Sequence, residues 1–313
     1  MKITEPGIYT MTAEEYHADP CPMPSLSSSI AKELLQCSAW HAWHAHPKLN
    51  RAFVREEQDK FNLGTAVHAY ILEGETNFVI VNERTWQTNA AKAAKADARL
   101  HKKTPLLAEQ WQRVQEMAAA LEPQLDRFED RPRPFLRGAG KPEQTVIWRE
   151  GELWFRARFD WLHDTRRNID DLKSTDASAN PEAWSRTLFN MGFDIQAAFY
   201  VRGLRAVAQV DPVFRFVVQE TYPPYAACVI GLHPLALEVG TRKVEYVINL
   251  WRECLATKRW PGYPSVTCWA EPPAWELAKW PELGAPRPAV PQDDGSRSLE
   301  ELMGLEKIET EDA

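Results

Sequence analysis

The chain contains 313 residues, of which 44% are hydrophobic and 26% are charged, and its formal net charge at pH 7 is −7. This composition is typical of a globular protein that is long enough for a buried core. No stretch approaches the roughly 20 apolar residues of a membrane span, and the N-terminus lacks the apolar segment of a signal peptide. We therefore expect a cytoplasmic protein without membrane association.

The negative net charge argues against nucleic-acid binding over the whole surface, although a confined basic groove is compatible with it. A basic stretch between residues 92 and 103 is one candidate, but it fits a solvated helix face at least as well. Five scattered cysteines lack the close spacing of a zinc or iron–sulfur site and are expected to be reduced thiols. The basic residues are Lys92, Lys95, Arg99, His101, Lys102 and Lys103, and the cysteines are Cys21, Cys37, Cys228, Cys254 and Cys268.

The N-terminal part of the chain is predicted to be helical. Short capping signals and apolar runs indicate helices within residues 1–60. Residues 61–73 are mostly apolar and predict one helix, with Gly64 and His68 one turn apart on the same face. The glycine would let another element approach closely. His68 by itself is more typical of a packed core histidine than of a metal ligand.

Farther along the chain, the pattern predicts two helices and then three strands. The helices fall within residues 88–122, which are rich in alanine, lysine and glutamine. Residues 143–148 and 154–162 predict the first two strands, and residues 169–173 predict the third. The polar run 164–167 between aromatic and β-branched segments indicates the turn of an antiparallel hairpin.

This hairpin brings charged residues together. If its turn is centred between Thr165 and Arg166, then Asp160 lies directly opposite Asp171, with about 5 Å between their Cβ atoms. Facing carboxylates are destabilising unless something binds between them, and a hard divalent cation with oxygen ligands suits the position. Lys173 projects from the same face as Asp171. Two carboxylates and an ammonium group at one place suit metal-assisted attack on a phosphodiester.

Three neighbouring residues admit more than one interpretation. Asp170 is the alternative to Asp171 as the acidic residue of the site. Because successive side chains of a strand point to opposite faces, Asp170 is directed to the other face of the sheet. Arg156 and Arg158 are four and two residues before Asp160, so their side chains point to the same face of the sheet, and contact with phosphate is one interpretation. The other is that Arg158 only balances the charge of the carboxylates. The sequence supports these two interpretations equally.

The C-terminal half begins with a helix signal at Asn180 and Pro181, since proline is favoured at the first helical position. On this helix Gln196 and Tyr200 are four residues apart and share a face. Two strands, 214–218 and 227–230, and an amphipathic helix, 240–258, are predicted to follow.

The predicted domain organisation is simple. Residues 1–283 are expected to form a single domain, with the catalytic core at 61–260 and a C-terminal extension at 261–283. Residues 284–313 are rich in proline and then acidic, which predicts a largely disordered tail. Within this tail, 296–308 is the only plausible short helix.

The order of elements and motifs resembles the PD-(D/E)XK nucleases, and more closely the RecE (exonuclease VIII) branch. The resemblance extends from Gly7 to about Pro261. It implies an α/β (α+β) fold with a restriction-endonuclease-like core, in which a central mixed sheet with an antiparallel meander is flanked by helices, with extra helices at the N-terminus. The matching motifs are Gly64–His68, Glu143, Arg158–Asp160, Asp171–Thr175 and Gln196–Tyr200.

The resemblance also implies a metal site. By it, Asp160, Asp171 and the backbone carbonyl of Leu172 would hold one Mg²⁺ ion, for which Mn²⁺ can substitute. His68 would complete the shell of this ion. Glu143 would approach a second metal ion or its water, in keeping with two-metal phosphodiester hydrolysis.

The same resemblance implies a role on DNA. Lys173 would orient the attacking water, while Gln196 and Tyr200 would position the strand. The implied activity is exonucleolytic digestion of double-stranded DNA ends, 5′ to 3′, which yields single-stranded overhangs for recombination in a phage or prophage of a bacterial host. A ring-shaped homo-oligomer and a single-strand annealing protein are the implied partners. An endonuclease or a single-strand-specific nuclease is the alternative, and a non-catalytic DNA-binding or phage module is the second alternative.

Overall fold

The computed structural model describes residues 2–50, 52–53, 63–74, 77–101 and 103–280. The chain divides into two compact units, 1–258 and 259–313. In the described part of the second unit there is a short helix, α10 (Ala274–Leu277). The predicted tail and its helix lie outside the described residues, and the predicted domain limits stay predictions.

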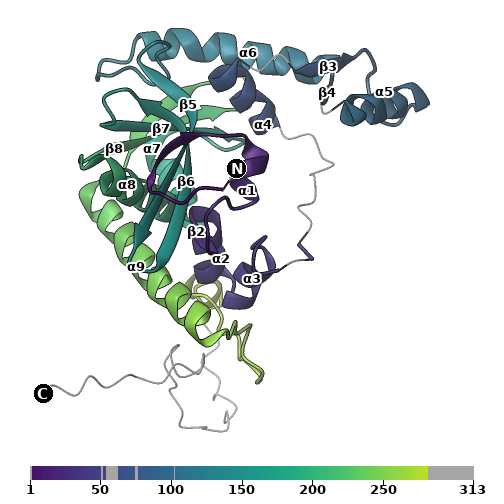
Figure 1. The fold of residues 1–313 in the computed structure, drawn as a ribbon. Helices are drawn as coiled ribbons and strands as arrows, with labels where there is room; N and C mark the ends of the chain where they lie inside the picture. Colours follow the sequence, from purple (N-terminus) through teal and green to yellow (C-terminus); the bar gives the residue numbers. More distant parts are fainter. Residues whose placement is uncertain (1, 51, 54–62, 75–76, 102, 281–313) are drawn as a thin grey trace, which may run out of the picture. The chain divides into compact units, whose positions relative to one another are not determined.

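The first unit is built around a mixed sheet (Figure 1). Its strand order is β1-β5-β6-β7-β8-β9, and β2 runs beside β6. The predicted antiparallel meander is formed by β5, β6 and β7, whereas β7 and β8 are parallel. The strands are β1 (Gly7–Thr10), β2 (Ser25–Ser27), β5 (Gly140–Glu150), β6 (Leu153–His163), β7 (Asn168–Thr175), β8 (Val213–Glu220) and β9 (Ala227–Gly231).

The turn between β6 and β7 gives the register that the sequence predicts. Arg166 adopts the left-handed conformation in this turn, with φ of 57°. On the rung next to Asp160 and Asp171, Trp161 pairs with Asp170. The paired rungs end there, so the two acidic residues stand where the strands begin to separate.

One face of the sheet is covered by α8 (Phe193–Ala208), which contacts β5, β6 and β8. Trp148 stacks on Phe155 with 5.1 Å between ring centroids, and Phe199 of α8 meets Trp148 edge-on at 5.0 Å. A Cβ atom at Gly203 would lie 2.6 Å from the Trp148 ring. The missing side chain at Gly203 therefore allows α8 to lie close against the sheet.

The helix predicted to start near residue 180 is interrupted. It consists of α7 (Pro181–Asn190) and α8, which are separated at Gly192 with φ of +62°. Helix α9 (Pro234–Thr257) packs against α8 and α2 (Ser28–Gln36). It begins before the predicted residue 240 because the His233 side chain caps it by accepting a hydrogen bond from the Leu235 N–H.

The opposite face of the sheet carries α4 (Leu63–His68) and α6 (Ala108–Asp126). Val67 of α4 belongs to the same apolar cluster as Leu172 and Val217 of the sheet. Successive side chains of a strand alternate in direction, so Leu172 points away from the face that Asp171 and Lys173 share with α8. The helix predicted over 61–73 continues beyond α4 as a π-helix, η1 (Ala69–Glu73).

The two helices predicted over 88–122 are present, but a strand lies between them. Strand β4 (Thr104–Leu107) pairs in parallel with β3 (Phe78–Val81) to form a separate two-stranded sheet. Helix α5 (Asn89–Leu100) packs on this small sheet, and α6 follows β4 directly.

The N-terminal part is less purely helical than predicted. It contains α1 (Ala13–His17), α2 and α3 (Ala39–His44), but also β1 on the edge of the sheet and β2 beside β6. No helix among the described residues is both long and apolar enough to cross a membrane.

Candidate active site

The candidate site lies where β6 changes neighbours. Its beginning, at Trp154–Arg156, pairs with β2, and its end, at Trp161 and Leu162, pairs with β7. Asp160 falls between these two stretches. Its carboxylate accepts a hydrogen bond from the Leu172 backbone N–H at 2.9 Å. A side chain therefore takes the place of the next strand-to-strand rung.

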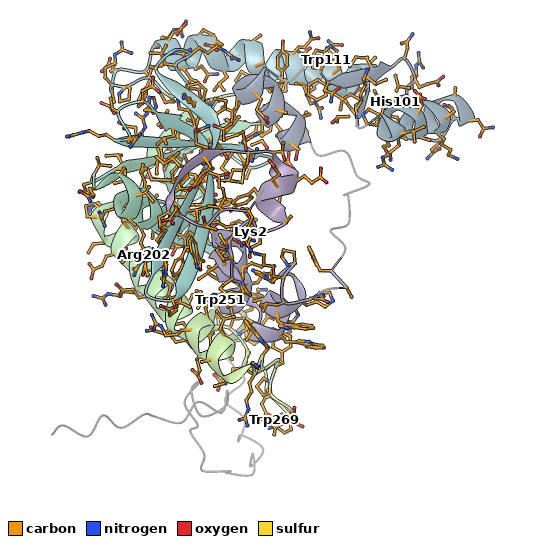
Figure 2. The ribbon with its side chains drawn as sticks, in the orientation of Figure 1. Lys2, His101, Trp111, Arg202, Trp251 and Trp269 are labelled. Atoms are coloured by element: carbon orange, nitrogen blue, oxygen red, sulfur yellow. The ribbon has the colours of Figure 1, made fainter. Side chains whose placement is uncertain are left out.

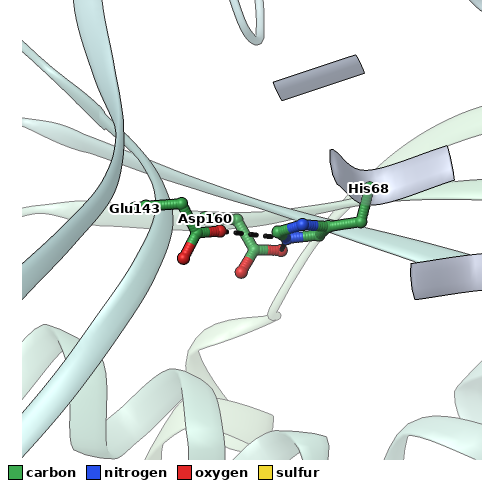
Figure 3. A group of neighbouring side chains, drawn as sticks. All are labelled: His68, Glu143 and Asp160. Atoms are coloured by element: carbon green, nitrogen blue, oxygen red, sulfur yellow. Dashed lines mark ion pairs between the residues drawn. The ribbon is translucent and has the colours of Figure 1, made fainter. Parts of the chain in front are cut away.

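Three side chains from separate elements meet beside this opening (Figure 3). His68 ends α4, Glu143 belongs to β5 and Asp160 belongs to β6. The Nε2 atom of His68 lies 3.1 Å from Asp160 Oδ2 and 3.5 Å from Glu143 Oε1. One ligand atom from each residue lies within 4.8 Å of those of the other two. Such a group has the size and chemistry of a metal site.

Glu143 reaches this group through an irregular backbone. The flanking rungs pair Pro142 with Trp161 and Gln144 with Phe159, which places Glu143 across from Asp160. Glu143 itself has φ of +53°. A left-handed residue within a strand costs about 1–3 kcal/mol and often marks a functional site.

Arg158 holds the Glu143 side chain in place. Its Nε pairs with Glu143 Oε2, and its Nη1 donates to the Met11 carbonyl oxygen at 2.8 Å. The guanidinium group therefore neutralises part of the acidic charge and ties β5 and β6 to the N-terminal segment. These contacts give Arg158 a charge-balancing role in the structure, and its contact with phosphate stays a prediction.

The acids and the histidine shift one another's pKa. Burial lowers the pKa of His68, but the charge and hydrogen bond of Asp160 outweigh burial and raise it to about 9. For Asp160, burial raises the pKa, and His68, Lys173 and the Leu172 N–H reverse this to a net lowering. Burial and the nearby Asp160 raise the pKa of Glu143, although His68 and Arg158 oppose the shift. His68 is accordingly protonated at neutral pH and balances the two carboxylates.

Asp171 is the buried centre of a second group. Its Oδ2 pairs with the Lys173 ammonium, and its Oδ1 accepts a hydrogen bond from Gln196 Nε2 at 2.5 Å. Burial and the charge of Asp160 raise the pKa of Asp171 to about 6. Lys173 lies over the rings of Phe193 and Phe216, 5.3 and 5.8 Å from their centroids. Asp171 is not one of the three residues whose ligand atoms cluster around His68, and its oxygens are held by Lys173 and Gln196.

Three residues that were expected to contact DNA are buried within the protein. Gln196 supports Asp171, and Tyr200 packs on Phe159 with 5.0 Å between ring centroids. Arg156 donates to the Ser25 carbonyl oxygen at 2.6 Å and is also buried. These side chains support the site from inside and do not present a free surface to a phosphate.

Asp170 lies in a different environment from Asp171. His163 Nε2 donates to its Oδ2 at 2.6 Å, and Arg215 Nε donates to its Oδ1 at 2.7 Å. The Arg215 guanidinium lies over the Phe128 ring, just beyond α6. Asp170 therefore belongs to a buried network on the α6 side of the sheet, as its parity in the strand predicts.

The basic stretch between residues 92 and 103 includes Lys92, Lys95 and Arg99 of α5 and the C-cap residue His101, while Lys102 lies outside the described residues. Lys92 and Arg99 are exposed, and Lys95 lies over the Trp86 ring at 5.5 Å from its centroid. Figure 2 shows the side chains around this helix, with His101 at its C-terminal end. Helix α5 packs on the small β3–β4 sheet, and none of the described residues of the stretch belongs to the two groups described above.

Comparisons with known proteins agree with this architecture. No curated protein matches the sequence. The structure is similar to the crystal structure of a protein from Eubacterium rectale described as a "Putative exonuclease", with 14% sequence identity, a TM-score of 0.55, and coverage of 88% of this chain and 100% of that one. Residues 27–270 match the family model of the PDDEXK-like domain of unknown function (DUF3799). The chain therefore belongs to this family of PDDEXK-like proteins.

Proposed function

We propose that this protein is a divalent-metal-dependent deoxyribonuclease that acts as an exonuclease on double-stranded DNA ends. The observation that carries the proposal is the juxtaposition of the His68, Glu143 and Asp160 group with the Asp171 and Lys173 pair. Asp160 connects the two groups because its charge affects the pKa of both His68 and Asp171. The PDDEXK-like family and the similar fold support the same chemistry.

The donor atoms fit a hard divalent cation. Glu143 and Asp160 offer carboxylate oxygens, and the ligand atoms are close enough to share an ion. His68 would offer one ring nitrogen after releasing its proton, since a histidine ligand is neutral. Oxygen-rich sites of this kind suit Mg²⁺ and Mn²⁺. Asp171 and the Leu172 carbonyl are proposed as further ligands. The bound ion would polarise the phosphate and lower the pKa of a water molecule.

Lys173 acts as a cation in this proposal. Burial lowers its pKa, but Asp171 and Asp160 reverse that effect and raise it. The group therefore stays protonated near neutral pH and is not a general base. It donates hydrogen bonds to the attacking water and to the phosphate oxygens that gain negative charge. Gln196 and the two phenylalanine rings fix the direction of this ammonium group through Asp171 and by packing.

The finer parts of the proposal rest on the resemblance to RecE-type enzymes. These parts are 5′ to 3′ polarity, single-stranded overhangs for recombination, assembly into a homo-oligomeric ring, and transfer of the product to a single-strand annealing protein in the cytoplasm of a bacterial host. Size-exclusion chromatography with light scattering tests the assembly. Strand-specific end labels test the polarity.

The activity is tested on linear and covalently closed circular duplexes of the same sequence. With Mg²⁺ we expect mononucleotide release from the linear duplex only, and no release with excess EDTA or with Lys173→Ala. Arg242→Ala is the matched control, because Arg242 is exposed and pairs with Glu238 on its own helix. Loss of the closed circle would show an endonuclease. No metal-dependent cleavage of any DNA would contradict the proposal as a whole.

A further inference from the structure

Lys32 is a cationic residue near the candidate site that the proposed chemistry has not used. It lies on α2, and its side chain is half-buried. Its ammonium is 5.6 Å from the centroid of the Phe193 ring, the same ring that Lys173 approaches at 5.3 Å. The charges of Lys173 and Asp171 both affect the pKa of Lys32. Two ammonium groups from different elements therefore converge on one aromatic side chain.

The position of Lys32 is fixed by packing. A Cβ atom at Gly192 would lie 2.9 Å from Lys32 Cδ and 3.2 Å from its Cγ. The aliphatic stem of Lys32 thus runs against the bare backbone at the break between α7 and α8. One turn earlier on α2, the Ser28 side chain forms a hydrogen bond with Tyr200, whose pKa is raised by burial and by the charges of Tyr16, Asp171 and Asp160. Residues four apart share a helix face, so this face of α2 is turned toward the site.

Lys32 differs in its partners from Lys173 and Lys243, which are also partly buried. Lys173 pairs with Asp171, and Lys243 pairs with Asp194 at 2.7 Å. Among the residues that the structure describes, Lys32 forms no ion pair with a carboxylate. Burial and the charge of Lys173 lower its pKa, and the charges of Asp171 and Glu33 oppose this shift without reversing it. A half-buried cation beside another cation is costly unless an anion neutralises it.

We propose that Lys32 binds a phosphate group of the DNA strand held at the site, next to Phe193 and Lys173. This inference rests on the proposed nuclease function and adds a strand-binding residue to it. The phosphate is either the terminal 5′ group or an internal one near the scissile bond, since both present the same anionic oxygens. Lys32 is a positioning residue, because its ammonium holds the strand while the reaction takes place at the metal ligands.

The test compares wild type, Lys32→Ala, Lys32→Arg and the surface control Arg242→Ala. For Lys32→Ala we expect KM to rise about 10-fold with kcat within about 2-fold, and the salt slope of DNA binding to fall by about 1, as for a lost phosphate contact. Binding is measured by anisotropy of a labelled duplex in EDTA, where hydrolysis cannot interfere. Lys32→Arg should restore most of the affinity, and Arg242→Ala should resemble wild type.

Duplexes with 5′-phosphate and 5′-hydroxyl ends distinguish the two phosphates. A penalty limited to the 5′-phosphorylated duplex assigns Lys32 to the terminal group, whereas an equal penalty assigns it to an internal one. If wild type cleaves DNA and Lys32→Ala keeps the same KM and salt slope, the Lys32 inference is wrong and the nuclease proposal stands. A fall in kcat alone would also overturn it. If wild type neither binds nor cleaves DNA, the proposed function itself fails.

Discussion

Two adjacent aspartates, Asp170 and Asp171, point to opposite faces of the sheet, and we assign a structural role to the first and a catalytic role to the second. Asp171 is held by Lys173 and Gln196 on the α8 side of the sheet, whereas Asp170 is held by His163 and Arg215 on the α6 side. Both carboxyl groups are fully buried. Burial alone therefore cannot distinguish them, and the difference lies in their partners.

Substitution of these neighbours should give opposite results. Asp171→Asn should lower the rate of DNA hydrolysis at least about 100-fold, the scale of losing one charge-stabilising group. Asp170→Asn should retain catalysis at low temperature but reduce the free energy of unfolding by about 3–5 kcal/mol, because it leaves buried cations without their partner. Initial rates and urea unfolding measure the two effects. Similar phenotypes for both variants would contradict this assignment.

His68 gives a pH dependence of stability in the protein without divalent metal. Its pKa is raised to about 9 by carboxylates that lie beside it in the folded state and not in the unfolded chain. Its contribution is therefore fully present below the unfolded pKa of about 6.5 and is lost as pH rises through about 9. We expect the free energy of unfolding in EDTA to fall over this window more steeply for wild type than for His68→Gln.

An NMR titration of the His68 ring checks the cause of this shift. Asp160→Asn should lower the pKa of His68, because Asp160 is the largest of the groups that raise it, while the opposing effect of burial remains. His68→Gln identifies the resonance. An unchanged His68 pKa in Asp160→Asn would show that other groups set it.

At the scale of elements, close helix packing positions the residues around Asp171. Helix α9 crosses α8 where a Cβ atom at Gly240 would lie only 2.4 Å from the Asp194 carbonyl oxygen. Asp194 is two residues before Gln196, and Lys243 of α9 pairs with its side chain. A displacement at this crossing would consequently move the helix turn that supports Asp171.

Gly240→Ala should therefore be destabilising, by about 1–3 kcal/mol as for overpacked cores. The sign is informative, because alanine in place of glycine within a helix ordinarily stabilises by about 1 kcal/mol. Thr241→Ala is the control, since Thr241 is exposed on the same helix. Thermal unfolding gives both values. A stabilised Gly240→Ala variant would mean that α9 moves freely away from α8.

The elements that could be predicted are those fixed by short-range patterns. The hairpin register follows from one short polar turn, and it places Asp170 and Asp171 on the observed sides. Strands β1 and β2 were missed because they are very short and pair with β5 and β6, far along the chain. The break at Gly192 is not predicted, because the helical spacing of apolar residues continues on both sides of it.

The site was predicted in part for the same reason. Asp160, Asp171 and Lys173 share one hairpin, so local geometry brings them together. The left-handed conformation of Glu143 has no local signal, since glutamate seldom adopts it. The burial of Arg156 depends on Ser25 and Asp19, and the approach of Lys32 depends on α8. Contacts between residues so far apart in the sequence cannot be predicted from the spacing of residues along the chain.

At the scale of the whole molecule, the site joins elements from distant parts of the chain. Helix α4, strands β5, β6 and β7, and helix α8 each contribute at least one side chain. Two carboxylates in the His68 group and Asp171 beside it concentrate negative charge within a chain of net charge −7. An ion bound at this junction would hold these elements together and stabilise the folded state.

Divalent metal should consequently raise the melting temperature. At a metal concentration about 100 times Kd the stabilisation is about 2.7 kcal/mol, which corresponds to several degrees. Mg²⁺ and Mn²⁺ should each give a saturable shift that EDTA reverses, and Asp160→Asn should abolish it. Differential scanning fluorimetry at matched ionic strength measures the shift. An equal shift in Asp160→Asn would place the ion elsewhere.

The bond from the Leu172 N–H to the Asp160 carboxylate has a consequence for spectroscopy. Most strand amides are protected from solvent deuterium by a neighbouring backbone carbonyl, whereas this one is protected by an ionisable side chain. Its exchange rate should therefore follow the state of that carboxylate rather than the opening of the sheet. A single backbone resonance in β7 can thus serve as an internal reporter of the charge at the candidate centre, without a label near the substrate.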